Sequence, residues 1–75
     1  MPRLPRVTGT QAVRALGRDG WRVERTTGSH QHLKHATKPG LVTVPIHSGR
    51  ILKPKVMQAI LAQAGLTADA FRALL

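Results

Sequence analysis

Two strands joined by a turn are predicted for the segment Trp21-Arg22-Val23-Glu24-Arg25-Thr26-Thr27-Gly28-Ser29-His30-Gln31-His32-Leu33-Lys34-His35. Apolar and polar residues alternate over positions 21–26, which is typical of a half-buried strand with Trp21 and Val23 pointing inward. Thr27-Gly28 is a turn signal, and the second strand covers residues 29–35. Because so short a turn joins neighbouring strands, the segment predicts an antiparallel hairpin.

Alternation also assigns the side chains of the second strand to its two faces. If Leu33 points into the core, Gln31 and His35 point inward with it. The outer face then carries the other three side chains, His30, His32 and Lys34.

A helix is predicted before the hairpin. Thr8 and Gln11 are spaced as a capping box, and Gly20 is a C-terminal stop signal. The inner stripe of this helix is formed by Ala12, Val13 and Leu16.

One strand and two helices are predicted after the hairpin. Residues 41–44 form the third strand, and a helix begins with Pro54 at its first position. Gly65 followed by a leucine indicates a Schellman ending, and Thr67 caps a short helix over residues 68–75. The longer helix buries the stripe Val56, Met57, Ile60, Leu61 and Ala64.

The order α-β-β-β-α, with a short helix appended, predicts an α+β fold. Short connections make the three-stranded sheet antiparallel, with both main helices on one face and the other face open. With 75 residues, the chain has room for one domain, which we expect to span residues 1–75.

Charge is the strongest global feature of the composition. Twelve Lys and Arg residues against three Asp and Glu residues give a formal net charge of +9. Such an excess favours a polyanionic partner, and it favours nucleic acid over an acidic protein. The absence of cysteine excludes disulfides and thiolate chemistry, and no apolar run predicts a membrane span or a signal peptide. A cytoplasmic location is therefore expected.

His30 is the candidate catalytic residue. Metal-free RNA cleavage needs a base for the 2′-hydroxyl proton and an acid for the leaving 5′-oxygen, and imidazole suits both because its reference pKa is about 6.5. Gly28 permits close backbone approach to this position. A metal site built from the histidines is disfavoured because His30 and His35 point to opposite faces, so neither a metal nor a cofactor is expected.

Several residues are candidates for binding phosphate. Lys53 and Lys55 flank a helix N-terminus, where free backbone N–H groups favour anions, and Arg50 lies just upstream. Ser29 and Lys34 flank His30 along the chain, and His47 is a possible second proton-transfer group. Six other arginines are interpreted as contributing a general positive potential and no specific contact. They are Arg3, Arg6, Arg14, Arg18, Arg22 and Arg25.

Four motifs occur in order along nearly the whole chain. They are Leu4-Pro5-Arg6-Val7-Thr8-Gly9, Gly28-Ser29-His30, Val42-Thr43-Val44-Pro45-Ile46-His47-Ser48-Gly49 with Leu52-Lys53-Pro54, and Gln63-Ala64-Gly65-Leu66. Together they resemble the HicA family of small RNA-cleaving toxins. The resemblance implies a double-stranded-RNA-binding-domain-like fold and a ribosome-independent endoribonuclease that cleaves single-stranded mRNA. It also implies a type II toxin–antitoxin system with a HicB-like antitoxin, and it maps the family's catalytic histidine onto His30.

The residue pattern also permits two other functions. The same fold and charge would suit a non-catalytic RNA-binding module, since phosphate binding at the helix start does not require His30 to react. A pure interaction domain for an acidic protein is the third alternative.

Overall fold

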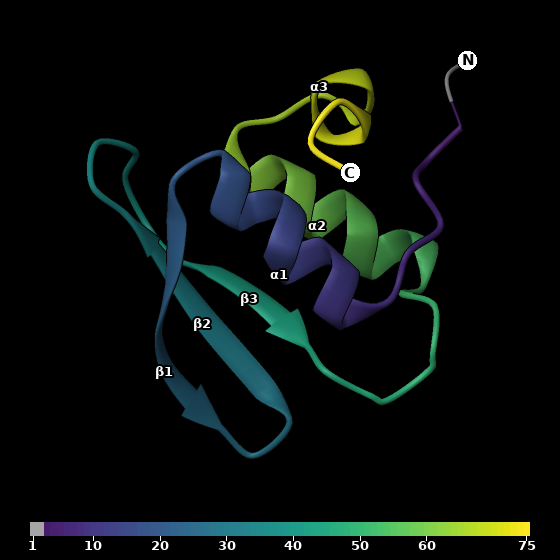
Figure 1. The fold of residues 1–75 in the computed structure, drawn as a ribbon, viewed down its shortest axis with the longest axis horizontal. Helices are drawn as coiled ribbons and strands as arrows, with labels where there is room; N and C mark the ends of the chain where they lie inside the picture. Colours follow the sequence, from purple (N-terminus) through teal and green to yellow (C-terminus); the bar gives the residue numbers. More distant parts are fainter. Residues whose placement is uncertain (1–2) are drawn as a thin grey trace.

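A three-stranded antiparallel sheet carries both long helices on one of its faces (Figure 1). The computed structural model describes residues 3–75, and its sheet has the strand order β1-β2-β3. The elements in chain order are α1 (Gly9–Arg18), β1 (Trp21–Thr27), β2 (His30–His35), β3 (Val42–Pro45), α2 (Pro54–Ala64) and α3 (Ala68–Arg72). The predicted α+β architecture is therefore confirmed.

Local capping chemistry fixes where α1 begins and ends. The Thr8 backbone N–H donates to Gln11 Oε1 at 2.9 Å, and the Gln11 N–H donates to Thr8 Oγ1 at 3.2 Å. This reciprocal pair is the predicted capping box, which satisfies donors that the helix itself cannot pair. Asp19 forms the C-cap, and Gly20 turns the chain into β1 with a φ of 102°.

The two C-terminal helices also follow their capping signals. Pro54 begins α2, and Gly65 ends it in the left-handed region with a φ of 67°. The Leu66 N–H donates to Leu61 O at 3.0 Å, which completes the predicted Schellman motif. Thr67 caps α3, but the helix ends at Arg72, earlier than the sequence predicts.

Side chains from every strand and helix meet in the core between the sheet and the helices. The largest fully buried side chains are Trp21, Phe71, Leu16, Leu33, Met57, Ile60, Val42 and Val44. Phe71 brings the short helix α3 into this core. Within residues 3–75, the longest helices fall short of the length and apolar character that crossing a bilayer requires.

The prediction that Val23 is buried is wrong. Its side chain is 44% exposed, and Trp21 is the single buried residue of β1. β1 is an edge strand, and a β-bulge between Val23 and Arg25 interrupts its pairing with β2. Bulges bend a strand and increase its twist, and the hairpin end of β1 and β2 projects beyond the helices (Figure 1).

Lys38 ties the loop between β2 and β3 to the ends of both long helices. Its ammonium group lies 2.6 Å from Asp19 Oδ2 and 3.0 Å from the carbonyl oxygen of Ala64. Because this ion pair is only partly exposed, it is screened less than a surface pair. The interaction holds the sheet against α1 and α2 at the end opposite the hairpin turn.

Gly9 lets α1 lie directly against the end of β3. A Cβ atom at this position would overlap the carbonyl oxygen of Pro45 and lie 2.9 Å from Ile46 Cδ1. Gly17, in the last turn of the same helix, has open space where its Cβ would be. The two helical glycines therefore have opposite roles.

We expect Gly9→Ala to lower the free energy of unfolding by about 1–3 kcal/mol, because the new methyl group overpacks a rigid backbone contact. Gly17→Ala should raise it by roughly 0.5–1 kcal/mol, because alanine is the better helix former. Urea denaturation of both variants measures the difference. Equal effects of the two substitutions would contradict the close contact between α1 and Pro45.

Candidate functional site

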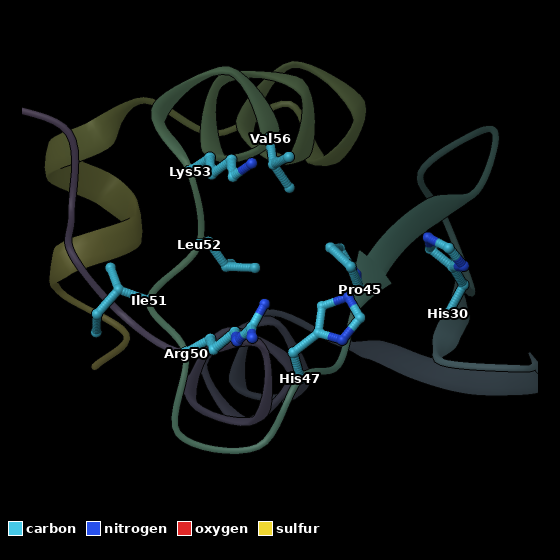
Figure 2. Close-up of a pocket in the computed structure, with 8 residues that line it drawn as sticks. All are labelled: His30, Pro45, His47, Arg50, Ile51, Leu52, Lys53 and Val56. Carbon is cyan, nitrogen blue, oxygen red and sulfur yellow. The ribbon is translucent and has the colours of Figure 1, made fainter.

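A pocket of ≈ 320 Å³ lies where the hairpin turn, the end of β3 and the start of α2 come together (Figure 2). Its lining residues are His30, Pro45, His47, Arg50, Ile51, Leu52, Lys53 and Val56. Two imidazoles, one guanidinium and one ammonium group thus share a pocket with an apolar wall. None of these eight lining residues is acidic.

The hairpin turn places His30 at the edge of this pocket. Gly28 in the turn has a φ of 57°, which a residue with a Cβ rarely adopts. His30 is the first residue of β2 and pairs with Thr27 on one side and Pro45 on the other. Its ring is exposed, so a substrate can reach it from solvent.

A tight turn after β3 holds His47 and Arg50. The Arg50 N–H donates to the carbonyl oxygen of His47 at 2.9 Å, and Gly49 between them has a φ of 73°. The predicted catalytic candidate His30 and the predicted candidates His47 and Arg50 therefore line one pocket, although His30 begins β2 and the other two lie in the loop after β3.

Lys53 and the apolar side chains complete the opposite wall. Lys53 is the N-cap residue of α2, and Val56 lies in the first turn of that helix. Figure 2 shows Lys53 and Val56 on the α2 side of the pocket, and Arg50 and His47 on the other side. The sequence did not assign Ile51 and Leu52 to the site, because isolated apolar residues in a loop carry no signal of a pocket.

Other predicted site residues lie outside this pocket. Lys55 is exposed on α2, and Lys34 is exposed on β2, with its ammonium group 3.9 Å from Glu24 Oε1. Ser29 lies in the turn next to His30, and its carbonyl oxygen accepts the Ile46 N–H at 2.6 Å. Ser29 therefore has a visible structural role, since it joins the hairpin turn to the loop after β3.

The positive charge of the pocket is not neutralised by any of the three acidic residues. Glu24, Asp19 and Asp69 are the three acids of the chain, and each lies within 4 Å of a cation outside the pocket. The pocket cations Arg50 and Lys53 therefore remain available to an anion. Within residues 3–75, no group of three His, Cys, Asp or Glu side chains is arranged to hold a metal ion.

His35 is a structural histidine. Its Nδ1 accepts the backbone N–H groups of Thr37 and Lys38 at 3.0 and 3.1 Å. Nε2 therefore carries the proton and donates to the carbonyl oxygen of Asp19 at 2.6 Å. The ring also meets Trp21 edge to face, with the ring centroids 5.2 Å apart. With both nitrogens engaged, His35 is unavailable for proton transfer.

His32 lies on the open face of the sheet, two residues from His30. Its Nδ1 is 3.0 Å from the hydroxyl oxygen of Thr43 on β3. It does not line the pocket. The three clustered histidines therefore occupy three different environments.

We expect His35→Ala to lower the free energy of unfolding by about 2–4 kcal/mol, because it removes several hydrogen bonds and a packed ring. His30→Ala should change it by less than about 0.5 kcal/mol, because the ring is exposed. Thermal and chemical denaturation would measure both. A large loss of stability in His30→Ala would show that its ring has structural contacts.

The fold and this pocket define a small basic α+β protein with two histidines and two cations at one end of its sheet. The family model described as "HicA toxin of bacterial toxin-antitoxin" matches residues 9–66, which include most of the chain and the whole pocket. The chain belongs to the HicA toxin family, whose members are toxins of bacterial toxin–antitoxin systems. No match was found among curated proteins.

Proposed function

We propose that this protein is a ribosome-independent endoribonuclease that cleaves single-stranded mRNA without a metal ion. The observation that carries the proposal is the convergence of His30, His47, Arg50 and Lys53 on one open pocket. Transesterification of RNA is accelerated by a base and an acid that transfer protons and by cations that stabilise the charge on the phosphate. Membership in the HicA toxin family supports a toxic activity of this kind.

His30 acts as the general base in the proposed reaction. It removes the proton of the 2′-hydroxyl group, and the 2′-oxygen then forms a bond with the adjacent phosphorus. The bond between phosphorus and the 5′-oxygen breaks, and His47 donates a proton to that leaving oxygen. The products are a 2′,3′-cyclic phosphate and a 5′-hydroxyl end.

Arg50 and Lys53 stabilise the negative charge that builds up on the phosphate oxygens. The guanidinium group can contact two oxygens at once, and Lys53 adds a charge beside the free N–H groups of the α2 N-terminus. Donors already in place for the transition state are typically the largest contribution to such catalysis. Lys34, Lys55 and Ser29 are proposed to bind phosphates outside the pocket.

The proposed protein partner is a HicB-like antitoxin. A toxin of a toxin–antitoxin system needs a neutralising partner, and the net charge of +9 suits an acidic surface. Covering His30 and the two pocket cations would block RNA and the reacting groups together.

We expect His30→Ala to reduce RNA cleavage by about 10²–10⁴-fold, because it removes the general base. The assay incubates a labelled single-stranded RNA with each protein in the presence of EDTA and identifies the cyclic phosphate end. RNA binding and thermal stability should remain close to those of the wild type.

His32→Ala is the matched control, since it removes a neighbouring imidazole that does not line the pocket. It should cleave RNA at nearly the wild-type rate. Undiminished cleavage by His30→Ala would disprove the assignment of the base, and RNA binding without any cleavage by the wild type would favour a non-catalytic RNA-binding module.

His47→Ala tests the general acid separately. We expect a loss of about 10²-fold or more on ordinary RNA, because the 5′-oxygen leaves without a proton. A substrate with sulfur in place of that bridging oxygen needs no proton on its leaving group, so the variant should cleave it at nearly the wild-type rate. An equal loss on both substrates would mean that His47 orders its loop instead.

A further inference from the structure

A second groove, of ≈ 570 Å³, adjoins the pocket that contains His30. The groove lies between the N-terminal segment Arg3–Arg6 and the segment Ile51–Pro54. Ile51, Leu52 and Lys53 line both the groove and the pocket. The two hollows are therefore neighbours on one surface, separated by a wall of three residues.

The backbone directly after the N-terminal segment is held next to this wall. The Leu52 N–H donates to the carbonyl oxygen of Val7 at 2.8 Å, and Thr8 forms a β-bridge with Ile51. Pro5 and Val7 are buried, whereas Arg3 and Arg6 are exposed. The two arginines therefore lie just before an anchored stretch of backbone, and both line the groove.

Positive charge continues from the pocket into the groove. Arg50 lies in the pocket, Lys53 lines both hollows, and Arg3 and Arg6 line the groove. No acidic residue is among the eight that line the groove. Leu4, Pro5 and Ile51 provide an apolar surface between these cations. A chain with regularly spaced phosphates and flat apolar faces matches this combination.

We propose that the groove is a second subsite for single-stranded RNA, which holds the nucleotides next to the scissile phosphate. Arg3 and Arg6 bind their phosphates, and the apolar surface contacts their bases. The choice of RNA as the ligand rests on the proposed function. The groove thereby lengthens the RNA-binding surface beyond the reacting nucleotides, and it makes affinity depend on substrate length.

The test measures binding of 2′-O-methyl oligonucleotides, which cannot be cleaved, by fluorescence anisotropy. The double variant Arg3→Ala/Arg6→Ala removes two charges from the groove. The control, Arg22→Ala/Arg25→Ala, removes two exposed charges from β1 that line neither hollow. Because the net charge changes equally in both variants, long-range attraction is matched.

The groove variant should bind a dodecanucleotide about as well as the wild type at about 1 M salt, and roughly 25-fold more weakly at about 0.1 M salt. Each phosphate contact on a single strand contributes about 5-fold over this tenfold range of salt, and the variant removes two contacts. The slope of log affinity against log salt should fall by about 1.4 in magnitude. The control should lose a few-fold at most. A dinucleotide, whose single phosphate would occupy the pocket, should bind both variants alike, and Arg3→Lys/Arg6→Lys should recover most of the lost affinity for the dodecanucleotide.

Equal weakening by the groove variant and the control would overturn the proposal, since charge alone would then explain binding. Unchanged RNA binding with weaker binding of an antitoxin would also overturn it and assign the groove to a protein. Wild-type cleavage of an unmodified dodecanucleotide, measured in parallel, tests the ribonuclease separately. Binding that depends on the groove, without cleavage, would reject the enzyme and retain the RNA subsite.

Discussion

The contact between the start of α1 and the end of β3 determines where the site forms. Gly9 lies against the carbonyl oxygen of Pro45, and Thr8 pairs with Ile51 beyond the intervening loop. The loop that carries His47 and Arg50 is thereby anchored at both of its ends. Pro45 also pairs with His30, so the same contact sets the position of the proposed base relative to the loop.

The other end of the sheet is held by groups that take no part in the proposed chemistry. His35 joins the second strand to the end of α1, and Lys38 joins the following loop to both long helices. Both ring nitrogens of His35 and the ammonium group of Lys38 are thus occupied by hydrogen bonds. The structural polar groups and the reactive ones are therefore separated along β2, at opposite ends of a six-residue strand.

Acidic residues are likewise kept apart from the cations that line the pocket and the groove. Each of the three acids lies beside a cation outside the pocket, and the remaining positive charge lies on exposed surface. Hollows lined by cations without acids focus the potential that attracts a polyanion. The chain belongs to a family of toxins from toxin–antitoxin systems, in which a partner neutralises the toxin. A basic surface of this kind is one that such a partner could cover.

The sequence by itself determined which helices and strands form and in what order, because capping boxes, Schellman endings and apolar periodicity are local, although α3 ends earlier than predicted. It also identified His30, His47, Arg50 and Lys53 as candidates, from residue chemistry and family resemblance. Only the tertiary structure brought them to one pocket, exposed Val23 on an edge strand with a bulge, and gave His35 its structural partners Asp19, Thr37 and Lys38. The physical reason is that these outcomes depend on contacts between segments far apart in the chain, which no local pattern records.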